Sequence, residues 1–181
     1  MKNNCKFLMI CLISSILTGV FGCKRAPVSQ NQDVKNEDFV GLANPVKESS
    51  KEDILTTTGL TFNVPEDAKN VRYSIISGSL AQADFLWNDA ECTVRAELSS
   101  ELELKDISGF YYDWQKSSVV KVGYNNATVK LYNSEEVTLG ICIWWDAVPG
   151  IMYSVSMKQN ATEKSLENLA NLVYVQMQGN S

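Results

Sequence analysis

The chain has 181 residues, and 16 lysine and arginine residues stand against 21 aspartate and glutamate residues, which gives a formal charge of −5. It contains no histidine, so neither the usual Ser-His-Asp and Cys-His catalytic groups nor an imidazole metal site can be built. The acidic balance, with only three scattered arginines, excludes the basic face that nucleic-acid binding needs. We therefore expect no nucleic-acid partner, no metal and no cofactor, and any enzyme would have to use carboxylates, lysine, tyrosine or cysteine.

Residues 1–22 have the composition of a secretory signal. Lys2 and Lys6 precede an apolar stretch over 7–21, and a small residue, Gly22, stands directly before Cys23. The apolar stretch is shorter than the ~20 residues that a permanent membrane-spanning helix needs. The alternative interpretation is a buried helix that ends by chance in Gly-Cys.

The string Val-Phe-Gly-Cys at 20–23 resembles the lipobox of bacterial lipoproteins, whose signal peptidase cuts before a diacylglycerated cysteine. The resemblance implies that residues 1–22 are removed and that Cys23 becomes the lipidated first residue. Two or three acyl chains would then hold the protein on the extracytoplasmic face of a cell membrane. Membrane lipid is thus the first expected partner.

The region 23–47 is polar, contains proline and has no hydrophobic period, which predicts a flexible linker whose more apolar later half folds onto the domain as an edge segment. A single globular domain is predicted over 48–179. It begins with a short helix, because Ser49 and Glu52 have the spacing of a capping box and Gly59 supplies a stop. Ile54 and Leu55 are expected to point inward.

From residue 60 onward, short segments of period two are separated by turn residues, which indicates an antiparallel meander. Turns are predicted at 77–79, at 88–89, around Asn125 and Asn126, and at 146–150. A closing amphipathic helix is expected to begin at Asn160, with an apolar face that packs on the sheet. The predicted strands are 71–76, 80–87, 92–98, 119–122, 128–132, 137–145 and 151–157, and the helix face is Leu166, Leu169, Ala170, Val173 and Met177. The fold class is therefore α+β, with about six to seven strands.

Several local strings, ANPV at 43–46, SIISGSLAQADF at 74–85, DISGFY at 106–111 and GICIWWDAVPGIMYSVSM at 140–157, resemble domain of unknown function 4367. Such domains occur in bacterial lipoproteins and in the extracytoplasmic parts of membrane-anchored regulators. The resemblance covers about residues 41–178. It implies a location and a fold type, and the family carries no established reaction or catalytic residues.

Two groups of aromatic residues are candidates for contact with a partner or ligand. Alternation places Trp145 on the apolar face of its strand and Trp144 on the other, where its indole either packs under a helix or loop or remains exposed for recognition. The acidic and aromatic string 110–114 contains Tyr111, Tyr112 and Trp114, whose rings could stack on a carbohydrate or contact a peptide. The alternative is that this loop closes the open end of the sheet core, which such loops commonly do.

The remaining cysteines and acids give weaker signals. Alternation assigns Cys92 to the core face and Cys142 to the opposite face, and a disulfide cannot form through a sheet, so two separate thiols are predicted. A disulfide is the alternative if a bulge changes one register or if both faces of the sheet are covered. The polar positions Glu91, Thr93, Arg95 and Glu97 are typical of a solvated face rather than of a carboxylate pair for glycoside cleavage. The chain is expected to be a non-catalytic binding or sensory module of the cell envelope, with an envelope protein or a glycan as ligand. A carboxylate hydrolase of envelope glycans and a structural component are the alternatives.

Overall fold

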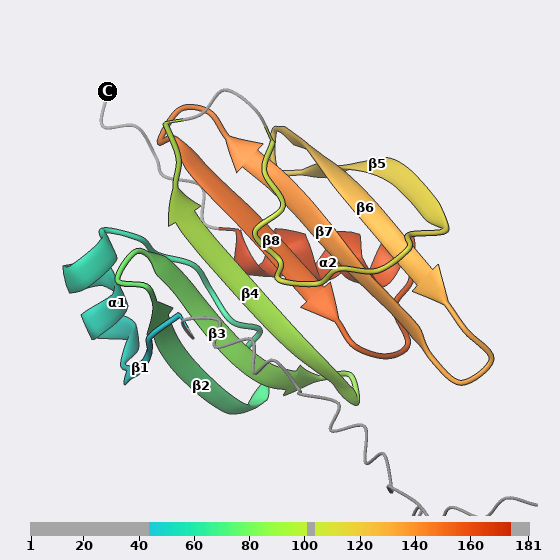
Figure 1. Ribbon diagram of the computed structural model, residues 1–181, viewed down its shortest axis with the longest axis horizontal. Coiled ribbons are helices and arrows are strands. Elements are labelled where there is room, and N and C mark those ends of the chain that lie inside the picture. Colours follow the sequence, from blue (N-terminus) through green and yellow to red (C-terminus); the bar gives the residue numbers. More distant parts are fainter. Residues whose placement is uncertain (1–43, 101–103, 175–181) are drawn as a thin grey trace, which may run out of the picture. The chain divides into compact units, whose positions relative to one another are not determined.

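The computed structural model describes residues 44–100 and 104–174, which form one eight-stranded antiparallel sheet with two helices (Figure 1). The predicted signal segment, Cys23, most of the linker and Met177 lie outside the described residues. The strands are β1 Val46–Ser49, β2 Lys69–Ile76, β3 Leu80–Trp87, β4 Ala90–Leu98, β5 Lys116–Val122, β6 Asn125–Asn133, β7 Thr138–Asp146 and β8 Ile151–Met157, and the helices are α1 Lys51–Thr58 and α2 Glu163–Val173. The α+β prediction is confirmed, with a sheet one strand larger than predicted because residues 46–49 form an edge strand.

The sheet consists of two four-stranded meanders that meet side by side. Its strand order is β1-β2-β3-β4-β8-β7-β6-β5, so the last strand of the first meander pairs with the last strand of the second. This seam aligns Val94 with Val155 and Cys92 with Met157. Tight turns join most consecutive strands, and at Asn88 and Asp89 both residues have positive φ, as a two-residue hairpin turn requires.

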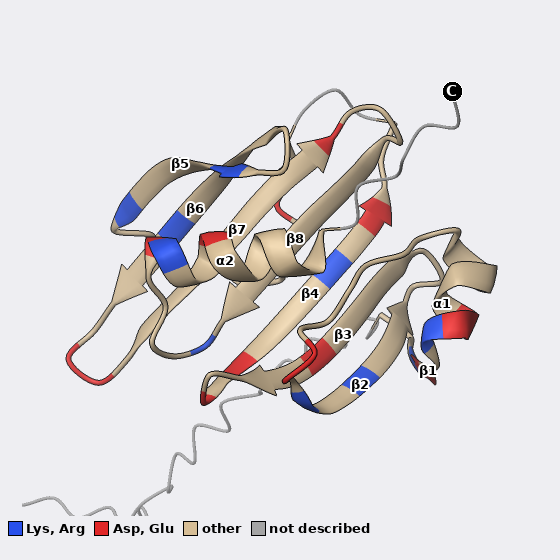
Figure 2. Cartoon of the chain, turned by 180° about the vertical axis from the view of Figure 1, so that it is seen from behind, with Lys and Arg blue, Asp and Glu red and all other residues tan. Residues whose placement is uncertain are grey.

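Helix α2 covers one face of the second meander, where it lies across β5 to β8 (Figure 2). Its apolar side, Leu166, Leu169, Ala170 and Val173, is buried as predicted. The main hydrophobic core lies on this side of the sheet and continues beneath α1, which contributes Ile54. Gly140 of β7 permits close approach, because a methyl group there would lie 2.8 Å from Leu166 Cδ1 and 2.9 Å from the Lys130 carbonyl oxygen.

Three local predictions need correction at element ends. The cap of α1 is Ser50, whose hydroxyl accepts from the Asp53 amide at 3.0 Å, so the capping box starts one residue later than predicted and Leu55 is turned outward. Thr162, rather than Asn160, caps α2, since its hydroxyl accepts from the Ser165 amide. The β5–β6 turn is formed by residues 123–124, because Gly123 supplies the positive φ.

The opposite face of the sheet is covered by the segment 104–115, which we call the aromatic loop. Figure 1 shows it crossing in front of the second meander while α2 lies behind. Ile107 and Ser108 of this loop are buried. As a result, all seven residues of β8 are buried. In β7, residues 139–144 are all buried, whichever side of the sheet their side chains face.

Candidate binding site

The aromatic loop carries a group of rings arranged around Tyr112. Residues 110–114 run without regular structure toward β5, and the rings of Phe110, Tyr112 and Trp114 lie next to one another. The Tyr112 ring lies 6.3 Å from Phe110, 5.8 Å from Trp114 and 5.2 Å from Tyr132 of β6, measured between ring centroids. Tyr112 is nevertheless 43% exposed, and Tyr111 is 88% exposed. The ring of Tyr112 is therefore held at its sides while part of its surface faces solvent.

An open hollow of about 590 Å³ lies beside these rings. Its lining consists of Asp106, Phe110, Tyr111, Tyr112, Asp113, Trp114 and Tyr132. The hollow thus combines flat apolar surfaces with two carboxylates and three phenolic hydroxyls, and its lining includes no lysine or arginine. None of the three hydroxyls hydrogen bonds to another residue in the described parts of the chain.

Arg95 of β4 holds the middle of the aromatic loop against the sheet. Its Nε donates to Gln82 Oε1 at 2.7 Å, and its Nη1 donates to the Ile107 carbonyl oxygen at 3.1 Å. Burial is the main cause that lowers the pKa of Arg95, and the negative charge of Asp84 opposes this shift. Gly109 passes directly over the guanidinium, with φ of +74° and no room for a methyl group. The Arg95 side chain therefore requires glycine at this point of the loop.

Further contacts attach both ends of the aromatic loop. Asp106 Oδ1 accepts from the Ser108 amide at 3.0 Å and from its hydroxyl at 2.6 Å, while Oδ2 forms an ion pair of 3.4 Å with Lys130 of β6. At the other end, the Gln115 amide donates to the Leu131 carbonyl. The rings are consequently presented by a segment that is fixed before, within and after the aromatic residues.

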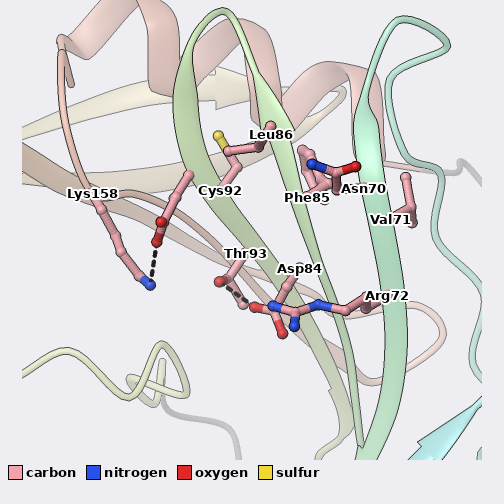
Figure 3. Close-up of a pocket in the computed structure, with 10 residues that line it drawn as sticks. Asn70, Val71, Arg72, Asp84, Phe85, Leu86, Cys92, Thr93 and Lys158 are labelled. Carbon is pink, nitrogen blue, oxygen red and sulfur yellow. Dashed lines mark hydrogen bonds and ion pairs between the residues drawn. The ribbon is translucent and has the colours of Figure 1, made fainter.

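A second hollow, of about 690 Å³, lies over β2, β3 and β4 and is polar in character (Figure 3). Two of its acids are engaged: Asp84 accepts from the Thr93 hydroxyl at 2.7 Å, and Glu91 forms an ion pair of 2.7 Å with Lys158. The hydrogen bond from Lys158 is the main cause that lowers the pKa of Glu91. A carboxyl group that acts as a general acid needs the opposite shift.

Among the predicted contact residues, Tyr111, Tyr112 and Trp114 lie together, and Trp144 does not join them. Trp144 is fully buried beneath α2, where it stacks on Tyr153 at 5.1 Å with an angle of 11° between the rings. Its prediction as a contact for a partner is wrong, and the alternative, an indole packed under a helix, is confirmed. Trp145 lies on the other face and is only half-buried, so it is not the core residue that was predicted.

Both cysteines are buried and free, as predicted, although the reason is different. Cys92 and Cys142 both belong to the core on the α2 side of the sheet. Strand β8 lies between them, and Cys142 pairs with Val155 whereas Cys92 pairs with Met157. Two strand spacings of about 4.8 Å already exceed the ~5.5 Å between Cα atoms that a disulfide needs.

Sequence reasoning missed the residues that support the site. The polar positions of β4 do not form a solvated face, because Thr93 is buried and Arg95 is half-buried beneath the loop. Tyr132 was predicted only as part of a strand. The one available signal was Arg95 itself, a long cationic side chain in the middle of a strand whose alternate residues, Val94 and Ala96, are apolar.

No family model, curated protein or solved structure matches this chain. The resemblance to domain of unknown function 4367 therefore stays a prediction. Within residues 44–100 and 104–174, no helix is long and apolar enough to cross a membrane. In the same ranges, no group of three or more cysteine, aspartate or glutamate residues is arranged to hold a metal ion. The fold and the site together define an α+β domain that carries an aromatic surface loop.

Proposed function

We propose that this protein is a lipid-anchored, extracytoplasmic binding module of the cell envelope, and that the aromatic loop is its contact surface. The observation that carries the proposal is that Tyr111 and Tyr112 are exposed on a segment that is otherwise fixed to the sheet. Exposed aromatic rings on a preorganised support lose little conformational entropy on binding. Ile107 and Ser108 of the loop are buried against the sheet, whereas the side chain of Tyr111 is 88% exposed and does not help to cover the sheet.

The anchor part of the proposal rests on the sequence of residues 1–23. A lipidated Cys23 followed by a polar linker would hold the domain near a membrane surface without spanning it. The resemblance to a family found in lipoproteins and in extracytoplasmic parts of regulators supports the same location. Membrane lipid is then the partner at the N-terminus, and an envelope protein or glycan is the partner at the loop.

A binding role is favoured over hydrolysis by the state of the acids. In the polar hollow, the pKa of Glu91 is lowered by Lys158, and Asp84 accepts hydrogen bonds from Thr93 and Gln82. In the aromatic hollow, Asp106 is paired with Lys130. A glycosidase requires one carboxyl group that remains protonated near neutral pH and faces a second one across the bond. These acids are arranged as salt-bridge and hydrogen-bond partners instead.

Acyl labelling tests the anchor. The full chain, expressed in bacteria that are fed an alkyne analogue of palmitate, should incorporate the label and sediment with membranes. Cys23→Ala should abolish the label, whereas Cys92→Ala, a change of the same kind at a buried thiol, should leave it unchanged. Labelling that persists in Cys23→Ala would refute the anchor assignment.

Ligand binding tests the contact surface. The mature protein in detergent micelles is titrated with members of two chemical classes, namely oligosaccharides and short peptides, while tryptophan fluorescence is recorded. We expect one class to bind and Tyr112→Ala to weaken it. Tyr124→Ala is the matched control, because Tyr124 is 81% exposed in the β5–β6 turn and does not line the hollow. Binding of no class, or binding that both variants weaken equally, would refute a contact role for the loop.

A further inference from the structure

The rings around the aromatic hollow are arranged as a platform. Tyr112 is supported by three other rings, with centroid distances between 5.2 and 6.3 Å, and keeps 43% of its surface exposed. Its support is attached to the sheet through Arg95 and Asp106. A platform of this kind suits a ligand with a flat apolar side, because the ring does not need to move or to be ordered when the ligand binds.

The polar groups of the hollow suit a ligand rich in hydroxyl groups. The phenols of Tyr111, Tyr112 and Tyr132 have no hydrogen-bond partner among the described residues, so each can donate and accept. Asp113, on the same rim, is exposed and can accept hydrogen bonds from hydroxyl groups. These polar groups lie next to the apolar rings. A sugar is complementary to this arrangement, because its faces carry C–H groups that can stack on a ring and its edges carry hydroxyl groups that can hydrogen bond.

The charge of the hollow decides among ligands of this kind. Its lining contains two carboxylates and no cation, and the charge of Asp106 is already balanced by Lys130. The remaining charge of Asp113 repels an anionic ligand at the rim. It attracts a cationic ligand, and both effects are small because a pair of exposed charges contributes about 0–1 kcal/mol. A neutral ligand is therefore favoured over an anionic one, and a cationic one gains little.

From these observations we propose that the aromatic hollow binds a neutral oligosaccharide. One sugar ring stacks on Tyr112, and the sugar hydroxyls hydrogen bond to Asp113 and to the tyrosine hydroxyls around it. The proposal rests on the proposed function, since it names the ligand class of the same contact surface.

The test uses the mature lipoprotein in detergent micelles, with calorimetric titration of defined probes. Chitohexaose and cellohexaose are the neutral oligosaccharides, a hyaluronan hexasaccharide is the anionic one, and a hexapeptide of alternating lysine and alanine is the cationic peptide. We expect at least one neutral probe to bind more tightly than both charged probes. Tyr112→Ala should weaken that binding about tenfold, Tyr112→Phe should retain most of it, and Tyr124→Ala should leave it unchanged.

The Asp113→Asn variant separates charge from shape. It keeps a hydrogen-bond acceptor at the rim and removes the negative charge, so the neutral probe should bind within about threefold of the wild type while the hyaluronan probe gains affinity. Melting curves of every variant confirm that the fold is retained. Unchanged selectivity in Asp113→Asn would overturn the role assigned to this carboxylate.

The remaining outcomes distinguish this inference from the proposed function. Tight binding of the peptide that is lost in Tyr112→Ala would overturn the oligosaccharide and leave the contact surface in place. Neutral binding that is insensitive to Tyr112→Ala would overturn the platform. If neither sugars nor peptides bind, both the inference and the proposed contact surface are refuted, while the lipid anchor is decided separately by the acyl label.

Discussion

Replacement of Arg95 by methionine should release the aromatic loop while the sheet stays folded. Methionine retains the apolar stem of the side chain and removes its two hydrogen bonds, to Gln82 at 2.7 Å and to the Ile107 carbonyl at 3.1 Å. A hydrogen bond from a charged donor contributes about 1.5–3 kcal/mol. Two such bonds give roughly 3–6 kcal/mol, and relief of the cost of burying the guanidinium offsets about half of this. The expected loss is about 2–3 kcal/mol.

Hydrogen exchange and urea unfolding measure this loss separately for the loop and for the whole domain. The hydrogen-bonded amides of Ser108 and Phe110 should exchange about 30–100-fold faster in Arg95→Met, because 1.4 kcal/mol corresponds to tenfold, while amides of β7 and β8 keep most of their protection. The free energy of unfolding of the whole domain should fall by the same 2–3 kcal/mol, or by less if the sheet stays folded while the loop is detached. Arg72→Met is the matched control, since Arg72 is exposed and forms no hydrogen bond or ion pair with another described residue. Equal exchange of the Ser108 and Phe110 amides in the two variants would contradict the role of Arg95.

Three further predictions concern the core. Gly140→Ala should lower the free energy of unfolding by about 1–3 kcal/mol in urea titrations, because the added methyl group would collide with Leu166 of α2; unchanged stability of this variant would contradict the collision. The thiols of Cys92 and Cys142 are buried and unpaired, so neither should react with Ellman's reagent before unfolding, and a reductant should leave the melting temperature unchanged. Rapid reaction of either thiol in the native state would contradict their burial. Burial raises the pKa of each thiol to about 12, so above pH 9 the folded state retains thiol protons that the unfolded state has lost. The free energy of unfolding should therefore fall as the pH rises from about 9 toward 12. A variant with alanine at both cysteines whose stability declined just as steeply with pH would refute this assignment.

Local alternation predicted most strands correctly but could not identify what covers each face. The core residues of β3, Ala81, Ala83, Phe85 and Trp87, are buried as their period of two predicts. In β7 the same rule selected one apolar face, although both faces are buried, because α2 covers one and the aromatic loop the other. Alternation of apolar and polar residues shows only which side of a strand is apolar and which is polar. It carries no information about a distant segment that later packs there.

The site was predictable only where its residues are adjacent in the sequence. Tyr111, Tyr112 and Trp114 were recognised as a group because they occur within four positions. Tyr132 joins them through the pairing of β5 with β6, which places the start of β5 beside Leu131. Arg95 reaches the same loop from the first meander, through the seam between β4 and β8. Contacts of this kind depend on strand order, which no local pattern determines.

The position of β8 has a consequence for how the protein is made. This strand is the last one in the described part of the chain, yet it lies in the middle of the sheet and joins the two meanders. Until residues 151–157 have emerged, β4 and β7 both present unpaired edges, which are sites where other chains can add. A product truncated before residue 151 would therefore aggregate rather than form half of the fold, and the sheet can close only after residues 151–157 have been made.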